Sequence, residues 1–596
     1  MRMKDIVVLT GKKTVLAVFM TAGIFLPCVG CAGQQNENST TNSSVNYDIE
    51  TEEQTTGKDE TAKETALSYM QQINNFTQKD SVQISENENQ IRGRTFYEIF
   101  VYSYSDSNGD GIGDFKGAQE KLDELNDGDQ TTDEDLSING IWLMPIMPSE
   151  SYHKYDVADY CCIDPQYGTM QDFESFLAAC NSRDIKVIID LPVNHTSSEH
   201  PWFLEACKYL KTLKDGEEPD VSVCPYVSYY HFSREKKEKY VQVPDSKWYY
   251  EAQFSDSMPD LNLETDAVYE ELEKIVTFWT DKGVDGFRLD AVKEFETGND
   301  TKSIAMLKRF VDLSKAIKPD IYLVAEVWNN MEVYTTYYES GINSCFDFAF
   351  ANQDGIIANT IKNAKGYNAY SYGKAVTKIQ NMIEEKNEEA VDAPFYTNHD
   401  MGRSAGYYSG DNSEAQTKMA QAMNLLMSGN AFIYYGEEIG MKGSGKDENK
   451  RAPMYFTKDS NAEFMCDGPA DMQNVKMKYP PLDEQKLDGN SIYQFVKETI
   501  KLRNHFAPIA NGKSEVMEVV SNQQIVTIRK EYDGKELLLV YNISDQAQTM
   551  DYADVTVNGK VPDSESLAGV LLTTAEPAVM KESTLSMPAY SVAVIQ

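Results

Sequence analysis

The acidic residues that end short apolar segments are the positions in this chain best suited to chemistry. Asp290 ends the segment VDGFRLD, two positions after Arg288. Because side chains alternate along a strand, Arg288 and Asp290 lie on the same face. A cation beside a carboxylate keeps it ionised, which is the state that a nucleophile needs. Taken alone, such a pair more often forms a structural ion pair, so the rest of the chain has to decide.

Three more apolar segments end in polar groups of the same kind. Glu326 ends IYLVAE, His399 and Asp400 follow APFYTN, and Asn194 and His195 follow KVIIDLPV. Stretches with helical periodicity, such as 269–281 and 303–317, alternate with these segments. Alternation of this kind predicts parallel strands joined by crossover helices.

The segments that read as strands number eight. They are TFYEIFVYSY, NGIWLMPI, KVIIDLP, VDGFRLD, IYLVAE, NSCFDFAF, APFYTNH and AFIYYGEE. Eight strands with helices between them predict an α/β fold, the (β/α)8 TIM barrel. In that barrel the carboxyl ends of all strands converge on one face, where catalytic groups collect.

With these segments in view, the chain resembles the α-amylase family of glycoside hydrolases from about residue 94 to its end. The family's ordered signatures are present as DLPVNH, GFRLDAVKE, AEVW and TNHD. A further motif, MPDLN at 258–262, is similar to that of an intermediate group. That group lies between typical α-amylases and the neopullulanase and oligo-1,6-glucosidase branches.

The resemblance implies roles for six residues. Asp290 matches the nucleophile, Glu326 the general acid/base and Asp400 the transition-state stabiliser, while Arg288, His195 and His399 match residues that hold the substrate. Retaining cleavage of a glycosidic bond needs one ionised and one protonated carboxyl group about 5–5.5 Å apart. Arg288 favours the charged form of Asp290. The apolar strand before Glu326 and a neighbouring carboxylate favour its protonated form.

Two further segments carry residues that the resemblance assigns to substrate binding. In SYHKYD, His153 matches a sugar-contacting histidine and Tyr155 a tyrosine that stacks on the sugar ring, which suits the apolar face of a pyranose. Lys154 stands where glycine is frequent, so we expect a different local loop. Lys293, after the nucleophile strand, matches a lysine on the leaving-group side. We also expect Arg403 to reach the cleft, although a solvated arginine is an equal alternative.

The segment DSNGDGIGD predicts a structural Ca²⁺ site. Its oxygen donors alternate as Ca²⁺ prefers, and they are Asp106, Asn108, Asp110, the Ile112 carbonyl and Asp114. The twelfth position holds Gly117 in place of the glutamate of an EF-hand, so the segment is an EF-like loop of the kind found in several amylase relatives. The alternative is a Gly/Asp-rich turn without an ion. The resemblance also implies a second calcium near Asn194, whose other ligands the sequence does not identify.

The N-terminal region predicts export and anchoring. Residues 1–31 combine early lysines and arginine, an apolar run over 14–26 and small residues before Cys31, as in a signal peptide with a lipobox. Residues 32–90 form a polar tether with one short helix over 58–79. We therefore expect an enzyme on the outer surface of a bacterial cell, lipid-anchored through Cys31. Secretion with cleavage nearby is the alternative.

The remaining chain divides into a catalytic barrel and a smaller C-terminal domain. We assign 91–510 to the barrel, with an inserted domain at 196–263 rich in Tyr and Lys, since so long a loop is usually functional or a small domain. From 511 to 596 short strands prevail, and EYDGK between QIVTIRK and ELLLVYN predicts a hairpin. We expect an antiparallel β-sandwich there.

Composition limits the partners. The net charge is −39, which argues against nucleic acid as a ligand but leaves a neutral polysaccharide unaffected. Two of the nine cysteines lie in the leader, and the odd number after Cys31 argues against a disulfide framework. We expect a monomer.

The leading expectation for function is α-1,4-acting, retaining hydrolysis of starch, maltodextrins or maltooligosaccharides. Trp328 after the acid and Lys293 after the nucleophile favour this activity. The alternatives are an oligo-1,6-glucosidase, neopullulanase or glucan transferase on the same scaffold. A catalytically inactive, glycan-binding member is a third possibility.

Overall fold

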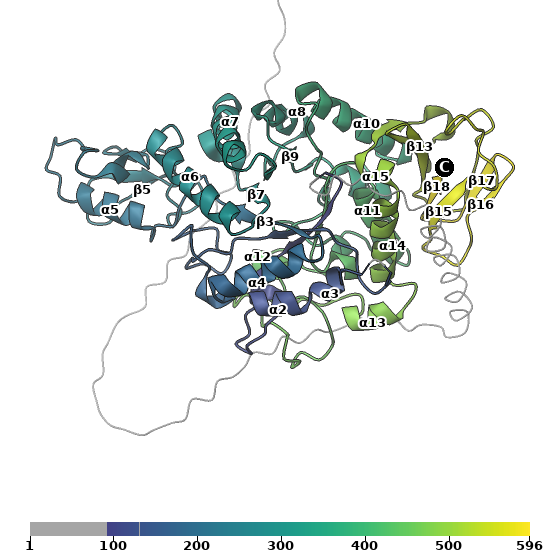
Figure 1. The fold of residues 1–596 in the computed structure, drawn as a ribbon, viewed down its shortest axis with the longest axis horizontal. Helices are drawn as coiled ribbons and strands as arrows, with labels where there is room; N and C mark the ends of the chain where they lie inside the picture. Colours follow the sequence, from purple (N-terminus) through teal and green to yellow (C-terminus); the bar gives the residue numbers. More distant parts are fainter. Residues whose placement is uncertain (1–91, 130) are drawn as a thin grey trace, which may run out of the picture. The chain divides into compact units, whose positions relative to one another are not determined.

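The computed structural model describes residues 92–129 and 131–596 (Figure 1). The predicted signal peptide, Cys31, and the tether with its short helix lie outside these residues. No helix in the described part of the chain is both long and apolar enough to cross a membrane.

A sheet of parallel strands forms the centre of the described structure. Its strands are β1 (Thr95–Ile99), β2 (Gly140–Leu143), β3 (Lys186–Leu191), β7 (Gly286–Leu289), β8 (Tyr322–Ala325), β9 (Ser344–Cys345) and β10 (Ala431–Tyr434), in the order β10-β1-β2-β3-β7-β8-β9. Parallel bridges from Phe346 to Ala393 and from Phe395 to Phe432 join β9 to β10 through residues 393–395. The ring therefore closes with eight strand positions, and the predicted TIM barrel is confirmed.

The predicted seventh strand, APFYTNH, is reduced to these two bridges. The other predicted strands are present but shorter.

The inside of the barrel is filled by one set of alternating strand residues. Phe96 of β1 stacks between Tyr322 and Phe432, with ring centroids 5.5 and 4.9 Å away. Gly140 makes room for this ring, because a Cβ at that position would lie 2.6 Å from the Phe96 ring. Two residues further along their strands, the same inward positions hold Glu98, Asp190 and Arg288. The barrel thus changes from an aromatic layer to a charged layer toward the carboxyl ends of its strands.

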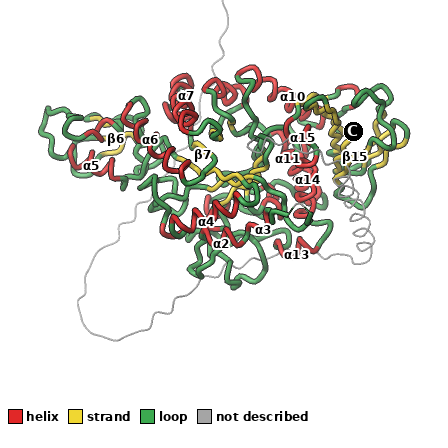
Figure 2. Tube along the Cα trace, in the orientation of Figure 1, coloured by secondary structure: helices red, strands yellow, loops and turns green. Residues whose placement is uncertain are grey.

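Helices follow most strands, and the longer ones pack on the outer side of the barrel (Figures 1 and 2). The α-helices of the described residues outside the insertion are α2 (Phe115–Glu120), α3 (Leu122–Leu125), α4 (Met170–Asn181), α6 (Asp266–Asp281), α7 (Asp300–Ile317), α8 (Met331–Tyr334), α9 (Ile356–Ile361), α10 (Ala369–Lys386), α11 (Ser413–Leu425), α12 (Asp447–Lys450), α13 (Leu482–Leu487), α14 (Ile492–His505) and α15 (Ala507–Asn511). The helical stretches predicted at 269–281 and 303–317 lie within α6 and α7.

The insertion after β3 contains one helix and a small antiparallel sheet. They are α5 (Pro201–Leu210) and the strands β4 (Phe232–Ser233), β5 (Tyr240–Gln242) and β6 (Tyr249–Glu251), in the order β4-β6-β5. The MPDLN segment ties the insertion to the barrel, because Asp260 pairs with His195 and Leu261 with Tyr230 through β-bridges.

Two antiparallel sheets form the C-terminal region. One contains β11 (Lys513–Val516), β12 (Ile525–Tyr532), β13 (Lys535–Asn542), β18 (Ser591–Ile595) and β15 (Leu567–Leu571), and the other β14 (Gln548–Asp551), β17 (Thr584–Met587) and β16 (Val579–Lys581). A shared apolar core packs between them, including Leu538, Val540, Leu585 and Met587. The predicted β-sandwich is confirmed, and the predicted hairpin joins β12 to β13.

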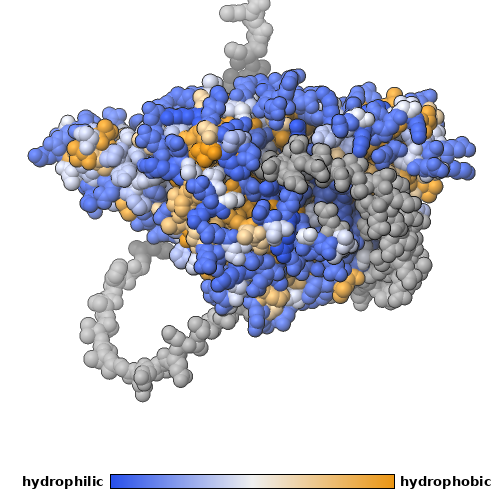
Figure 3. Space-filling model, viewed as in Figure 1, coloured by the Kyte–Doolittle hydropathy of each residue, from blue (hydrophilic) through white to orange (hydrophobic). Residues whose placement is uncertain are grey.

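The described surface in Figure 3 is largely hydrophilic, in keeping with the high net charge. The seven cysteines of the described residues are free thiols.

Candidate active site

The guanidinium of Arg288 joins three carboxyl groups at the mouth of the barrel. Its Nη1 donates to Asp190 Oδ1 at 2.9 Å and to Asp290 Oδ1 at 2.6 Å, and its Nη2 donates to Glu326 Oε2 at 2.6 Å. Arg288 is 1% exposed. The predicted pair of Arg288 and Asp290 on one face of a strand is therefore observed, and Glu326 from the next strand joins it.

A left-handed residue completes the contact between the two strand ends. Ala291, which follows Asp290, has φ +46°, a conformation that costs energy for any residue with a Cβ. Its amide donates to Glu326 Oε2 at 3.1 Å. Arg288 Nη2 and the Ala291 amide therefore both donate to Oε2 of Glu326. This leaves Oε1 as the atom that carries the proton when Glu326 is neutral.

The surroundings of Glu326 favour that neutral form. Burial raises the pKa of Glu326 to about 7, and the negative charges of Asp290 and Asp400 add to this shift, whereas Arg288 opposes it. One arginine cannot balance all the carboxylates around it.

Asp400 is held on both carboxylate oxygens. His399 Nε2 lies 3.1 Å from Oδ2, and Arg451 Nη2 donates to Oδ1 at 2.8 Å. Burial alone would raise the pKa of Asp400, but His399 and then Arg451 hold it well below its usual range. Asp400 and Glu326 are therefore pushed toward opposite protonation states.

His399 is buried and cationic. Its Nδ1 lies 2.6 Å from Glu98 Oε1, and its Nε2 lies 2.7 Å from the Tyr155 hydroxyl. Burial lowers the pKa of His399, but Asp400 and Glu98 outweigh that effect and raise it to about 9. The charged ring can donate from both nitrogens at neutral pH.

His195 and His153, the other two histidines predicted to bind substrate, are neutral, and one offers the site a hydrogen-bond acceptor and the other a donor. Burial lowers the pKa of both His195 and His153, the latter to about 4. His195 Nε2 lies 3.2 Å from the Tyr155 carbonyl, and its buried Nδ1 has no protein partner among the described residues. A neutral His195 that donates from Nε2 therefore keeps an unpaired acceptor at Nδ1. His153 Nδ1 accepts from the Tyr155 amide, which leaves its Nε2 as the donor.

Tyr155 is fixed by polar contacts. Its hydroxyl donates to Asp190 Oδ2 at 3.0 Å and contacts His399, and the ring is 9% exposed. Lys154 beside it occupies the glycine-like position with φ +61°, and its buried Nζ pairs with Asp164 Oδ2 at 2.7 Å. The loop keeps the conformation that glycine would adopt, because this ion pair and the packing around it offset the backbone strain.

Arg403 is a correction to the prediction. It is 1% exposed, and its guanidinium donates to the backbone carbonyls of Lys450 and Tyr435, so it is not available to a substrate. Lys293 stays partly exposed, and its Nζ lies 3.5 Å from Glu294 Oε1. The structure shows no contact between Lys293 and the three carboxylates.

Comparisons with known proteins agree with this geometry. The family model described as Alpha amylase, catalytic domain, matches residues 98–512. The chain belongs to the α-amylase family. It is 37% identical over 468 residues to Alpha-amylase 3 of Dictyoglomus thermophilum, covering 78% of this chain and 88% of that protein. It is 27% identical over 572 residues to Oligo-1,6-glucosidase of Parageobacillus thermoglucosidasius, covering 81% of this chain and 97% of that protein.

Among solved structures, Eubacterium rectale Amy13B matches with a TM-score of 0.81 and 49% identity. The match covers 85% of this chain and 95% of that one. This family member is therefore an α-amylase-type glycoside hydrolase with a carbohydrate substrate.

Sequence reasoning missed several residues of this amylase-family site. Like Asp290, Asp190 and Glu98 lie near the carboxyl ends of their strands, β3 and β1, at positions that point into the barrel. Counting every second residue along these strands would have identified them. Arg451 follows the short helix α12 in a loop, where no local pattern marks it. Two exposed rings also border the site: Phe254 lies 5.5 Å from the His195 ring, and Trp328, 47% exposed, stacks on Phe348.

The predicted calcium loop of this family member is a series of side-chain-stabilised turns. Asp106 Oδ1 accepts from the amides of Asn108 and Gly109, and its Oδ2 accepts from Gly111. Asp110 Oδ1 accepts only from the Ile112 amide. The donors are oxygens, as Ca²⁺ requires. No group of three or more His, Cys, Asp or Glu side chains in residues 92–129 and 131–596 is arranged to hold a metal ion.

The expected second calcium near Asn194 remains a prediction. The Asn194 side chain donates to Asp260 Oδ1 at 3.3 Å, and burial raises the pKa of Asp260 to about 7.

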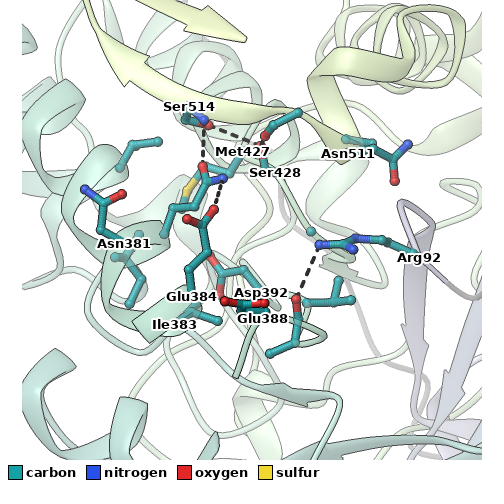
Figure 4. Close-up of a pocket in the computed structure, with 18 of the residues that line it drawn as sticks. Arg92, Asn381, Ile383, Glu384, Glu388, Asp392, Met427, Ser428, Asn511 and Ser514 are labelled. Atoms are coloured by element: carbon teal, nitrogen blue, oxygen red, sulfur yellow. Dashed lines mark hydrogen bonds between the residues drawn. The ribbon is translucent and has the colours of Figure 1, made fainter. Parts of the chain in front are cut away.

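A cavity of about 570 Å³ lies elsewhere, between α10, β11 and the loop before β10 (Figure 4). It adjoins Asp392 and Gly429, which precede strand positions, so it sits at the amino ends of the strands and not at the catalytic face. Its described lining contains Glu384, Glu388 and Arg92 but no aromatic ring. We assign it no part in the reaction.

Proposed function

We propose that the enzyme hydrolyses α-1,4-glucosidic bonds of starch, maltodextrins or maltooligosaccharides with retention, through a covalent glucosyl-enzyme. The observation that carries this proposal is the shared guanidinium: Asp290 and Glu326 contact the two terminal nitrogens of Arg288. Two carboxyl groups so close together suit double displacement, because an inverting enzyme needs a wider gap for a water molecule.

The proposed reaction begins at Glu326 and Asp290. Glu326 Oε1 donates its proton to the glycosidic oxygen while Asp290 attacks the anomeric carbon, so the bond to the leaving sugar breaks and an ester forms. A water molecule then gives a proton to Glu326, attacks the anomeric carbon and releases Asp290.

Other residues hold the sugar during these steps. Asp400, ionised between His399 and Arg451, stabilises the oxocarbenium-like transition state. His195 Nδ1 accepts from a sugar hydroxyl, and His153 donates to another. His399, whose two ring nitrogens contact Glu98, Tyr155 and Asp400, acts by orienting Asp400. Arg288 hydrogen-bonds to the carboxylates and not mainly to the sugar. Tyr155 forms the bottom of the sugar-binding site. Lys293 contacts the leaving-group side.

The α-1,4 specificity is supported by the relatives. Identity to the α-amylase of D. thermophilum is 37%, whereas identity to the oligo-1,6-glucosidase of P. thermoglucosidasius is 27%. The MPDLN motif supports placement in the intermediate group, close to both activities.

Product analysis tests this specificity. We expect short maltooligosaccharides from amylose and from maltoheptaose, with α-configured reducing ends in the first seconds, and little glucose from isomaltose. Parallel digestions of amylose, pullulan and isomaltose, followed by chromatography and NMR, give the answer. Release of glucose from isomaltose with intact amylose would assign the enzyme to the oligo-1,6-glucosidase branch. Products longer than the maltoheptaose supplied would indicate a glucan transferase.

We also propose that Ca²⁺ binds the loop at 106–114 through Asp106, Asn108, Asp110, the Ile112 carbonyl and Asp114. The ion would brace the first barrel loop and take no part in the chemistry. The support is the type and spacing of the oxygen donors.

Removal of calcium should lower the melting temperature by about 2–4 °C, because ligand release removes a few kcal/mol of stability and a chain of this size loses roughly 1 °C per kcal/mol. Calorimetry with EGTA, and then with excess Ca²⁺ or Mg²⁺, measures the shift, which only Ca²⁺ should reverse. Asp110→Ala should abolish the response. Asp129→Ala is the matched control, since Asp129 forms a similar exposed turn with Thr131 outside the loop. Identical melting with and without EGTA would refute the site.

Finally, we propose that the enzyme is extracellular, as a monomer lipid-anchored at the bacterial cell surface through Cys31. A polymeric substrate outside the cell supports this location. Expressed in a bacterial host, the wild-type protein should sediment with membranes and the Cys31→Ala variant should not. A variant that stays in the membrane fraction would rule out the anchor.

A further inference from the structure

Arg451 directs all its donor groups at the rim of the proposed active site. Nη2 donates to Asp400 Oδ1 at 2.8 Å, Nη1 donates to the Tyr152 hydroxyl at 3.0 Å, and Nε donates to the His399 carbonyl at 3.3 Å. The side chain is nearly buried, with 5% exposed. A buried arginine with this set of partners is fixed in a single orientation.

The backbone that carries Arg451 is anchored from below. The carbonyl of Lys450 accepts from Arg403 Nε at 3.0 Å and from the Tyr434 hydroxyl at 3.3 Å. Lys450 Nζ in turn donates to the Asp400 carbonyl at 2.8 Å. Arg403, which was expected to meet the substrate, instead holds the segment that presents Arg451.

Tyr152 connects Arg451 to the loop on the other side of the site. Its ring packs edge-on against Phe100 and His153, with centroids 6.2 and 5.4 Å away. Arg451 therefore links the loop after β2, which carries His153, with the segment that carries Asp400.

We propose that Arg451 is a positioning residue that fixes the carboxylate of Asp400, and that the Tyr152 hydroxyl holds Arg451 in the required orientation. This inference rests on the proposed function, in which Asp400 stabilises the transition state.

The physical reason is the geometry of the Asp400 carboxylate. His399 holds Oδ2 and Arg451 holds Oδ1, so the carboxylate plane cannot rotate while both contacts persist. Without Arg451 one oxygen is free, and the carboxylate turns away from the orientation that the transition state needs. Misplacement of about 1 Å costs about 10²-fold in rate.

Charge supports the same assignment. The charged or titratable groups around Asp400 include His399, Arg451, Arg288, Glu326, His153 and Tyr155, with Glu98 behind His399 and Lys450 Nζ on the Asp400 backbone carbonyl. Burial works against ionisation of Asp400, and His399 and Arg451 are the cations in direct contact with its carboxylate.

The test compares steady-state kinetics of Arg451 variants. Arg451→Ala should lower kcat about 10²-fold with KM changed less than about threefold, because the contact acts in the transition state. Guanidinium at tens of millimolar should restore part of kcat, and Arg451→Lys should retain intermediate activity. Tyr152→Phe should lose about tenfold in kcat, as expected for one hydrogen bond to a charged group.

A surface triad of the same composition supplies the matched control. Arg309 of α7 pairs with Asp266 Oδ1 at 2.7 Å and lies over the Tyr269 ring at 3.8 Å. Arg309→Ala should leave kcat and KM unchanged and should not respond to guanidinium.

Three results would overturn the inference. A higher KM with unchanged kcat would make Arg451 a simple substrate contact. A lower melting temperature together with activity that neither guanidinium nor Arg451→Lys restores would make it purely structural. If the wild-type enzyme hydrolyses amylose and Asp290→Asn does not, an unaffected Arg451→Ala variant refutes this inference alone. A wild-type enzyme without glycosidase activity refutes the proposed function instead.

Discussion

Replacement of Asp290 by asparagine should lower kcat on maltooligosaccharides by at least about 10⁴-fold, the scale of losing a nucleophile. Asparagine keeps the shape and an oxygen acceptor for Arg288, but its amide cannot form the ester with the anomeric carbon. The fold should persist, because Asp290 contacts Arg288 at the barrel mouth and does not belong to the apolar core. Initial rates on maltoheptaose, with circular dichroism of both proteins, measure this effect. Unchanged hydrolysis would instead favour the hypothesis that the protein is a catalytically inactive, glycan-binding family member.

Azide separates the role of Asp290 from that of Glu326. In Asp290→Ala, azide enters the vacated space on the nucleophile's side and should give a β-glycosyl azide from an α-glycosyl fluoride. In Glu326→Ala, the glycosyl-enzyme still forms on Asp290, and azide should give the α-product. NMR of the products distinguishes the two. The same anomer from both variants would contradict the assignment.

Loss of the Glu326 acid should produce the second large effect. Glu326→Gln should reduce kcat/KM by about 10²–10⁴-fold on maltooligosaccharides, the usual contribution of general acid catalysis. The fluoride leaving group needs no proton, so hydrolysis of an α-glycosyl fluoride should fall much less. Equal losses on both substrates would show that Glu326 does not act as the acid.

The pH profile of the wild-type enzyme should carry the signature of the same group. The pKa of Glu326 is raised to about 7 by burial and then by the charges of Asp290 and Asp400. The acid works when protonated, so kcat/KM should fall as pH rises through about 7, and Glu326→Gln should lack this limb. The contribution of Glu326 to folding stability also falls as pH rises, because its pKa is higher in the folded state than in the unfolded state. This contribution is fully present below about pH 4.5 and is lost by about pH 7. A wild-type limb that persists unchanged in Glu326→Gln would contradict this assignment.

Strand periodicity was a sound guide to the centre of the site. Alternation in VDGFRLD placed Arg288 and Asp290 together, and the strand-end rule brought Glu326 to the same guanidinium. The weakest strand prediction was APFYTNH, where only isolated bridges form. Its neighbours in the ring, β9 and β10, complete the closure without a long ladder.

Predictions outside the strands were less reliable. Arg403 lies three residues after Asp400 and was expected at the cleft, yet it points to backbone carbonyls beneath. Arg451, much further along the chain, contacts Asp400 directly. Proximity in sequence does not determine direction in a loop, because no repeating backbone geometry fixes where successive side chains point.

The amino-acid sequence by itself determined the class of fold and the carboxylates that gather at its mouth, since a period of two sets the face on which each strand residue lies. Only the tertiary structure decided which cation meets which oxygen. Arg451 reaches Asp400, Lys154 pairs with Asp164 in a glycine-like turn, and the Tyr155 hydroxyl turns to Asp190. These contacts come from segments far apart in the chain, brought together when the barrel closes and its loops pack, and no local period encodes that approach.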